Sequence, residues 1–312
     1  MSALGADASA PAPGALRRPL WRRFLRHRLA AASLVFLAVI TTGALGAPWI
    51  QTQLGVNAFG VDLFNRFGPP GGGSVLGADE VGRDLFARLL YGGRVSLAVG
   101  LTAAVFAALI GTAVGLAAGF YGGRLDALLM RTTDGVIALP ILPLLIVLAS
   151  VDLTKLGLDP ATATGAWAGL ARIVVIIALV GWPTVARLVR AETLSLKTRA
   201  YVTAARALGA TPRAIMWRHI LPNTLPVVVV ATTLSIGNII LLESVLSFLG
   251  LGVQPPTPSW GNMLTNAQEL VWSHPHLAVW PGAMIFATVI AFNFVGDGLQ
   301  DALDPRSDAR GS

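Results

Sequence analysis

Few residues of this chain have side chains that commonly catalyse reactions, and their spacing fits no familiar catalytic site. The sequence has no cysteine and four histidines, so disulfides and thiolate metal sites are excluded. His274 and His276 are two residues apart, which makes a poor metal site without further ligands. Lys155 and Lys197 are the only lysines, and neither follows the glycine-rich turn of a phosphate-binding loop. Since no serine has the setting of a nucleophile elbow, we predict that the chain is not an enzyme and holds no cofactor or metal.

One carboxylate lies inside a long apolar run, where a charged group is costly. Glu243 is part of Ile239–Leu251 and has two interpretations. It lines a substrate pathway near an outer gate, or it is a structural carboxylate bonded to Ser or Asn on a neighbouring helix. Asn238 is a second pathway candidate, although hydrogen bonding between helices is the default role for Asn238 and for Asn293. No chain of buried carboxylates suggests a proton relay, so energy for uphill transport would come from a partner.

The composition predicts an all-α, polytopic membrane protein. Hydrophobic residues make up 54% of the chain and charged residues only 12%, roughly half the charge of a soluble protein. The apolar residues form blocks, each near the roughly 20 residues with which a helix crosses a bilayer. The six predicted transmembrane helices are approximately 29–50, 95–120, 133–151, 173–189, 225–250 and 277–299.

The basic residues are unevenly distributed between the predicted loops, and this asymmetry predicts the orientation. All but six of the 23 Lys and Arg lie on the side of the two termini. Since basic loops stay in the cytoplasm, both termini and the segment 190–223 are predicted to be cytoplasmic. A nucleic-acid surface is the alternative explanation, but the basic residues border membrane spans. The six on the opposite side are Arg66, Arg83, Arg88, Arg94, Lys155 and Arg172.

The predicted layout follows from these spans. Residues 1–15 have little to bury and are predicted to be disordered. The first apolar run is too long for the core of a signal peptide, so we expect an uncleaved first helix. The layout is a basic cytoplasmic tail (1–28), a first transmembrane helix (29–50), an extracytoplasmic loop with an amphipathic helix (51–94), a membrane core (95–300) with its cytoplasmic loop 190–223, and a cytoplasmic tail (301–312).

The extracytoplasmic loop contains the pattern of a short helix. Val81, Leu85 and Leu89 are four residues apart and would share one helical face. The pattern predicts a short amphipathic helix at the outer surface that leads into the second span. Asp84 and Arg88 have the same spacing, which predicts an exposed ion pair.

Glycine and proline mark special positions in the spans. Gly111, Gly115 and Gly119 lie on one face of the second span, which predicts a close contact with another helix, although glycine is also common in membrane helices. Trp260 lies in the proline-rich outer loop 252–264, and a contact with another subunit is one interpretation of it. Prolines interrupt the third and fourth spans and should kink them; they are Pro140, Pro143 and Pro183.

The segment Tyr201–Asn223 is basic and amphipathic and lies between two long apolar runs. Gly209 can adopt backbone angles closed to other residues and suits a turn, and Pro212 suits the first turn of a second helix. The segment therefore predicts a helix–turn–helix. It could seat in a partner's groove and transmit motion to both flanking spans, or it could lie on the inner leaflet as an amphipathic linker. Its apolar residues at helical spacing are Val202, Ala205 and Leu208, then Ile215, Trp217 and Ile220.

The same segment resembles the EAA motif of ATP-binding-cassette (ABC) importer permeases, in which E-A-A, G and I-x-L-P recur at set spacing. The matching residues are Ala204, Ala205, Gly209, Leu221 and Pro222, while Thr203 replaces the Glu and His219 replaces the Ile. Three further segments, 76–88, 243–252 and 254–264, resemble the "C" permease (DppC/OppC-like) of the dipeptide/oligopeptide/nickel importer family. The similarity covers about residues 20–306.

This resemblance implies a type I ABC importer permease with a MetI-like fold, located in the bacterial cytoplasmic membrane. It would form half of a translocation pathway for di- and oligopeptides. The implied partners are a homologous "B" permease in a heterodimer, two cytoplasmic ATPases, an extracytoplasmic substrate-binding protein and membrane lipid, but no nucleic acid. By resemblance, ATPase coupling is assigned to Thr203, Ala204, Ala205, Gly209, Ala210, Pro212, Arg213, His219, Leu221 and Pro222.

Two alternatives stay open on the sequence. Within the same importer class, the substrate could be a nickel chelate, glutathione or an oligosaccharide. Outside that class, the chain could be a stand-alone secondary transporter or channel, although the missing inverted repeats and carboxylate chains argue against it.

Overall fold

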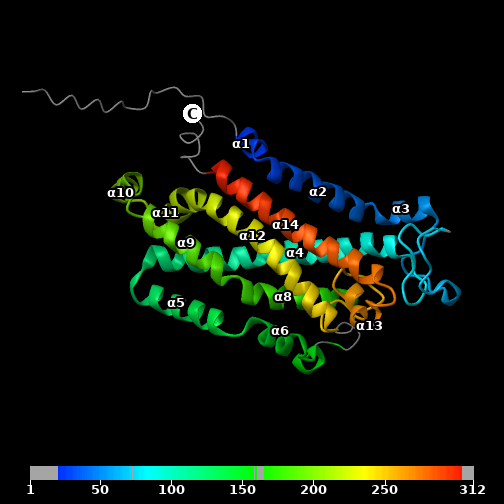
Figure 1. Ribbon diagram of the computed structural model, residues 1–312. Helices are drawn as coiled ribbons and strands as arrows, with labels where there is room; N and C mark the ends of the chain where they lie inside the picture. Colours follow the sequence, from blue (N-terminus) through cyan, green and yellow to red (C-terminus); the bar gives the residue numbers. More distant parts are fainter. Residues whose placement is uncertain (1–19, 72, 158, 160–164, 304–312) are drawn as a thin grey trace, which may run out of the picture.

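The protein is built from α-helices joined by loops (Figure 1). The computed structural model describes residues 20–303 except 72, 158 and 160–164, and no β-strand forms within that part. The long helices are α2 (Arg28–Leu45), α4 (Leu85–Tyr121), α12 (Leu221–Phe248) and α14 (His276–Leu303). The helices of intermediate length are α5 (Gly123–Ala138), α6 (Ile141–Ala149), α8 (Ala166–Gly181) and α9 (Pro183–Leu196).

Short helices complete the described chain. Near the N-terminus and in the first loop these are α1 (Leu20–Arg26), α3 (Ala47–Leu54) and η1 (Leu63–Asn65). The middle of the chain adds η2 (Leu153–Leu156), α10 (Ala200–Ala207), α11 (Pro212–Ile215) and the π-helical turn η3 (Met216–Ile220). The last loop adds η4 (Asn262–Leu264) and α13 (Ala267–Leu270).

The predicted fold class is confirmed. Four helices of the described chain are long and apolar enough to cross a membrane, and the number rises to six if each bent pair is one span. The pair α5–α6 bends by 88° and the pair α8–α9 by 43°. The bends occur at the predicted proline positions, since Pro140 directly precedes α6 and Pro183 begins α9. Proline has no N–H to continue the hydrogen bonds of the preceding turn.

Two expectations about the loop 51–94 are wrong. The expected short helix and the second span form one continuous helix, α4, which starts at Leu85 because the Asp84 carboxylate accepts a hydrogen bond from the Ala87 amide at 2.7 Å. Asp84 and Arg88 are not an exposed pair, because only 7% and 5% of their surfaces are exposed. The Arg88 Nε atom instead lies 3.3 Å from Asp79 Oδ2. A four-residue spacing cannot distinguish an exposed pair from two buried residues with separate partners.

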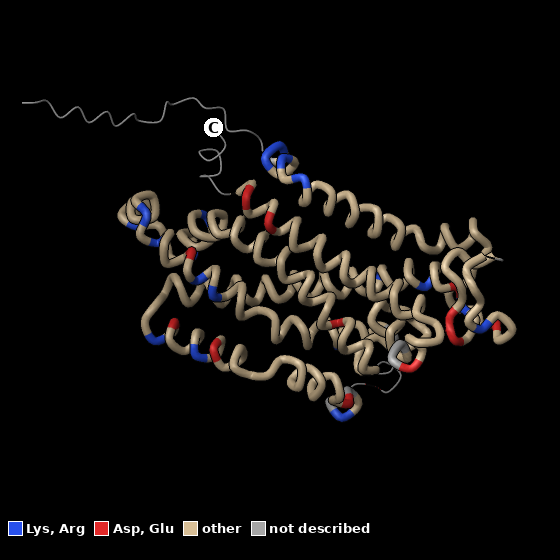
Figure 2. Tube along the Cα trace, viewed as in Figure 1, with Lys and Arg blue, Asp and Glu red and all other residues tan. Residues whose placement is uncertain are grey.

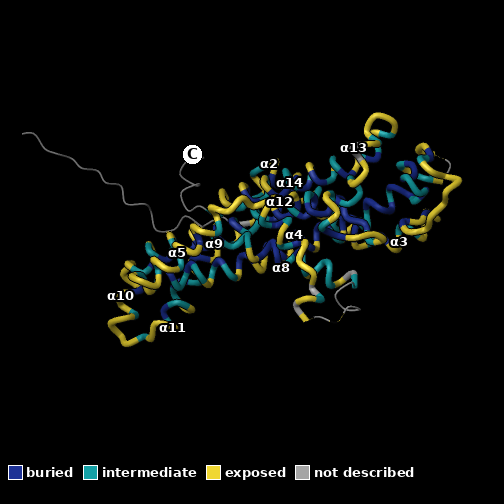
Figure 3. Tube along the Cα trace, turned by 90° about the horizontal axis from the view of Figure 1, so that it is seen from below, coloured by how far each residue is buried: buried dark blue, intermediate teal, exposed yellow. Residues whose placement is uncertain are grey.

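Helix α4 forms the centre of the bundle and packs against α2, α8, α9 and α12. The buried residues lie along this central axis (Figure 3). Glycine permits the close approach: a Cβ atom on Gly100 would lie 2.5 Å from Ile240 Cγ1 of α12. The predicted glycine stripe faces α9, and a Cβ on Gly115 would lie 2.5 Å from the Ala186 carbonyl oxygen.

The two ends of the bundle differ in their charge. One end carries α1, α10, α11 and the C-terminal end of α14, and the opposite end carries α3, the loop 55–84 and α13 (Figure 1). Lys and Arg gather at the first end, the middle of the bundle is almost free of charge, and the opposite end mixes both signs (Figure 2). The long helices therefore present an apolar belt between two polar ends, as a membrane requires.

Candidate functional site

The segment predicted as a helix–turn–helix forms a hairpin of α10 and α11, which we call the coupling hairpin (residues 200–220). Helix α10 ends where the Leu208 amide donates to the Ala204 carbonyl and the Ala210 amide donates to the Ala205 carbonyl, both at 3.0 Å. Gly209 follows with φ +83°, a left-handed conformation that favours glycine. The closing bonds and this glycine explain why the turn falls where the sequence places it.

The second arm of the coupling hairpin runs directly into a membrane helix. Thr211 caps α11 by accepting from the Ala214 amide at 3.3 Å, and Pro212 occupies the first turn. The chain continues without a break through η3 into α12, so that Pro212–Phe248 is one helical stretch of 37 residues. A displacement of α11 therefore moves the adjoining end of α12 with it.

A buried apolar cluster fixes the coupling hairpin to the bundle. Val202 of α10 and Ile215 of α11 are buried, together with Ile220 of η3. Leu116 and Phe120, near the end of α4, pack against this cluster. The hairpin is consequently attached to α4 as well as to α12.

The opposite face of the coupling hairpin is free in this chain. Leu208 is 89% exposed and Trp217 is 68% exposed, so two large apolar side chains lie on this face without cover. Thr203, at the position where the EAA motif has Glu, is exposed, and its hydroxyl donates to the Arg199 carbonyl at 3.1 Å.

The remaining predicted coupling residues lie on or beside this hairpin. Ala204, Gly209, Pro212, Arg213 and Pro222 are exposed, whereas Ala205, Ala210, His219 and Leu221 are half-buried. The His219 ring lies 6.3 Å from the Tyr201 ring, and the His219 carbonyl accepts from Asn223 Nδ2 at 2.6 Å. The structure thus brings all of the predicted coupling residues together at one end of the bundle.

The two bent pairs meet α12 at a pocket of about 370 Å³, which we call the break pocket. Its lining comes from α5, α6, α8, α9 and α12, including the residues at both bends. The polar side chains in it belong to Thr184, Ser235 and Asn238, and none of its lining residues is ionisable. Asn238, a predicted pathway residue, is exposed there and makes no hydrogen bond to the described chain.

Glu243, the other pathway candidate, is 0% exposed and lies between α4 and α12. Ser96 Oγ donates to Glu243 Oε2 at 3.0 Å, and Ser247 Oγ donates to Oε1 at 2.7 Å. The Trp260 amide donates to Ser96 Oγ at 3.2 Å, and the Val253 amide donates to Ser247 Oγ at 3.0 Å. Glu243 thus has the neighbouring-helix serine partner of the structural interpretation, and through the two serines it holds the loop 249–264.

The suggested contact of Trp260 with another subunit is wrong, because this side chain is 0% exposed within the chain. Its indole Nε1 donates to the Leu89 carbonyl at 3.0 Å. A Cβ on Gly93 would lie 3.0 Å from the ring, so this glycine of α4 makes room for the indole. No local pattern indicates this pairing, since the two segments are far apart in the chain.

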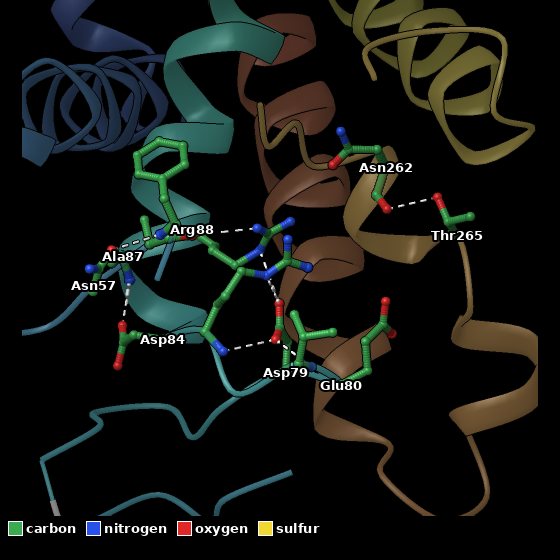
Figure 4. Close-up of polar contacts among 12 residues, drawn as sticks. Asn57, Asp79, Glu80, Asp84, Ala87, Arg88, Asn262 and Thr265 are labelled. Atoms are coloured by element: carbon green, nitrogen blue, oxygen red, sulfur yellow. Dashed lines mark hydrogen bonds and ion pairs between the residues drawn. The ribbon is translucent and has the colours of Figure 1, made fainter. Parts of the chain in front are cut away.

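A second polar network lies at the end of the bundle opposite the coupling hairpin, and Figure 4 shows its contacts around Asp79 and Arg88. Asp79 accepts hydrogen bonds from the Arg83 amide at 2.9 Å and from Arg83 Nε at 2.7 Å, and it also contacts Arg88. Glu80 Oε1 accepts from Asn266 Nδ2 at 3.0 Å, which links the loop before α4 to the loop between α12 and α14. A pocket of about 270 Å³ lies between these loops. The described residues contain no group of three His, Asp or Glu side chains placed to hold a metal ion.

Comparison with known proteins identifies the family. Residues 111–308 match the model of the binding-protein-dependent transport system inner membrane component. The chain belongs to this family. Residues 16–65 of this permease also match the N-terminal transmembrane domain of oligopeptide transport permease C, so the resemblance to the C permeases is confirmed. The family is a transport family and not a family of enzymes, and its members are inner-membrane subunits of ABC importers.

The relatives match nearly the whole permease. It is 40% identical over 289 residues to a protein of Pectobacterium atrosepticum named "Glutathione transport system permease protein GsiD", covering 93% of this chain and 91% of the relative. A protein of the same name from Escherichia coli O6:K15:H31 is 41% identical over 297 residues, covering 94% and 93%.

A solved structure supports the fold. A chain of the MetNI methionine ABC transporter, in inward-facing conformations, matches with a TM-score of 0.55 and 22% identity, covering 70% of this chain and 98% of that chain. At this identity the likeness shows the MetI-like fold alone. An importer of this class works with a second permease, ATPases and a binding protein, which defines the kinds of partner in general.

Proposed function

We propose that this permease forms half of the pathway of an importer for short peptides and that the coupling hairpin docks a cytoplasmic ATPase. The proposal rests chiefly on the hairpin: it exposes Leu208 and Trp217 while its buried side is fixed to α4 and α12. The substrate class is supported by the relatives named as glutathione permeases, because glutathione is itself a tripeptide. The pathway half would be completed by a homologous second permease in a heterodimer.

The proposed orientation places the coupling hairpin and both termini in the cytoplasm. Lys and Arg residues gather at this end of the bundle (Figure 2), and basic segments are retained on the cytoplasmic side during insertion. The loops around Asp79 and Trp260 would then face the extracytoplasmic binding protein.

The geometry gives the docked ATPase two mechanical connections to the membrane helices. The buried cluster of the hairpin moves with the end of α4, and α11 is continuous with α12. Since α12 carries Asn238 and Glu243, movement of the hairpin would reach the break pocket and the outer loop. ATP binding would draw the hairpins of the two permeases together and open the path outward, and hydrolysis would reset it.

Reconstitution in proteoliposomes tests this function. The permease, its second permease, the ATPases and the binding protein are combined, and uptake of a labelled tripeptide is measured with and without ATP. ATP-dependent uptake that requires the binding protein is expected. Uptake without either component would indicate a secondary transporter and overturn the proposal.

Docking is tested with the exposed leucine of the coupling hairpin. Leu208→Glu replaces an apolar contact surface with a charge and should abolish co-purification of the ATPases with the permease. Leu63→Glu is the matched control, because Leu63 is 64% exposed at the opposite end of the bundle. Equal ATPase recovery with both variants would show that the hairpin is not the docking surface.

A further inference from the structure

The break pocket exposes backbone groups that a continuous helix would pair. At the bend between α5 and α6, the carbonyls of Ile137 and Leu139 accept no backbone hydrogen bond within the described chain. Pro143, one turn after Leu139, has no N–H to donate to it. The amide of Ile141, at the start of α6, is also without a backbone partner. These three unpaired residues all line the pocket.

The second bend adds fewer free groups. Pro183, at the start of α9, has no N–H to donate to the preceding turn, although a hydrogen-bonded turn still spans Trp182. The wall of the break pocket formed by α5 and α6 thus presents unpaired C=O and N–H groups. At membrane depth, such groups persist only where they line a polar cavity or are buried in protein.

The polar side chains in the break pocket also offer both hydrogen-bond donors and acceptors. The Asn238 amide can donate through its NH2 group and accept through its carbonyl oxygen, and the Thr184 hydroxyl can also donate and accept. Both side chains are exposed and make no hydrogen bond within the described chain. The Ser235 hydroxyl donates a hydrogen bond to the Ala231 carbonyl at 2.7 Å, so its oxygen remains available as an acceptor. No lining residue carries a charge.

We propose that the break pocket is a subsite for the peptide groups of the substrate, a step that rests on the proposed function as a peptide importer. A peptide group has one N–H and one C=O, so it can pair with the free carbonyls and amide of the bend between α5 and α6 and with Asn238. Because the pocket lacks charged residues, it recognises the backbone in place of the charged ends. Backbone pairing is independent of the substrate's side chains and lets one pathway accept different sequences.

A helix of the second permease is a weaker occupant for this pocket. The backbone of a membrane helix is hydrogen-bonded within itself, so it could offer only side chains to the unpaired groups. A short peptide substrate arrives with its backbone groups free. The unpaired groups of the break pocket therefore match the substrate better than the partner subunit.

The test compares a peptide with an ester analogue that lacks one backbone N–H. Uptake KM is measured for trialanine and for the same compound with its central amide replaced by an ester, in the complete reconstituted importer. The ratio of the two KM values gives the preference for the amide. Comparing this ratio between permease variants cancels the preference of the binding protein, because that protein is the same in each case.

Asn238→Leu removes the pocket amide, and Asn293→Leu is the matched control. Asn293 is likewise an exposed asparagine within a span, but it lies on α14 and does not line the break pocket. The amide preference should fall about fivefold in Asn238→Leu, as expected for one hydrogen bond, and stay unchanged in Asn293→Leu. An unchanged preference in both variants would overturn the subsite while leaving peptide transport in place.

If the Asn238→Leu permease does not assemble into the importer, a cross-linking experiment tests the subsite instead. A photoreactive benzophenone residue at position 238 should label radioactive trialanine during turnover, and the same residue at position 293 should not. Labelling of the second permease alone from position 238 would overturn the subsite. If the wild-type importer does not transport trialanine at all, the proposed function itself fails, which distinguishes the two results.

Discussion

Replacing Gly115 by alanine should weaken the contact between α4 and α9 more than its size suggests. The new Cβ would lie 2.5 Å from the Ala186 carbonyl oxygen and 2.8 Å from Val189 Cβ. Both neighbours are parts of α9 that cannot rotate away, because one is backbone and the other is attached directly to it. The strain can be relieved only if the two helices separate.

The size of the effect follows from these distances. Ordinary contacts are about 3.5–4.0 Å, so relief of the 2.5 Å contact needs α9 to retreat by roughly 1–1.5 Å. A gap of about 0.5–1 Å already loses a quarter to a half of the dispersion energy of each separated atom pair. Overpacked sites of this kind cost typically about 1–3 kcal/mol. Gly111 and Gly119 face α9 in the same way, with added Cβ atoms at 2.7 Å from Trp182 O and from Thr193 Cβ, so a separation at Gly115 spreads along the whole stripe.

Thermal unfolding of the detergent-solubilised permease measures this loss, with Gly135→Ala as control. Gly135 lies within α5, and its added Cβ would meet nothing within 4 Å. That substitution should be neutral or raise stability by up to about 1 kcal/mol, because alanine favours helix over glycine. The reasoning is refuted if Gly115→Ala unfolds at the same temperature as Gly135→Ala or above it.

Further predictions concern two groups of polar side chains. Glu243→Ala should leave the Ser96 and Ser247 hydroxyls without their acceptor, at about 1–3 kcal/mol for each buried group, and should increase proteolysis of the loop 249–264. Glu243→Gln keeps one acceptor oxygen and should be milder in both assays; a Glu243→Gln variant with wild-type stability but no transport would instead favour the pathway role. Asp126→Asn should lower thermal stability by about 1–3 kcal/mol, because Asp126 accepts two hydrogen bonds from Arg190 at 2.5 and 2.7 Å. Asp134→Asn, in contrast, should change it by less than about 0.5 kcal/mol, since the Arg187–Asp134 pair is half exposed; equal losses in the two variants would contradict this ranking.

Local patterns in the sequence predicted the features that depend on neighbouring residues. The apolar blocks predicted the spans, because crossing a bilayer needs a continuous apolar helix of set length. The prolines at 140 and 183 predicted the two bends, because a missing N–H acts on the turn just before it. Gly209 and Pro212 predicted the hairpin turn for the same local reason, and the turn occurs between α10 and α11.

Spacing alone failed where a residue's partner lies far away in the chain. Asp84 and Arg88 satisfy the spacing of an exposed helical pair, yet both are buried and use other partners. Trp260 had the character of an interface residue in the sequence, yet it is enclosed by α4. In both cases the fold covers the residue with a segment that no local pattern connects to it.

The sequence by itself determined that this protein is a helical membrane permease with a coupling hairpin between two spans, because hydropathy, breaks and motif spacing are properties of contiguous residues. Only the tertiary structure decided which polar groups meet inside the bundle. Ser96 and Glu243 are 147 residues apart, and Leu89 and Trp260 are 171 apart. The break pocket likewise exists only because two separate bends face α12. Such meetings depend on how closely the helices pack, which the glycines of α4 allow but do not specify.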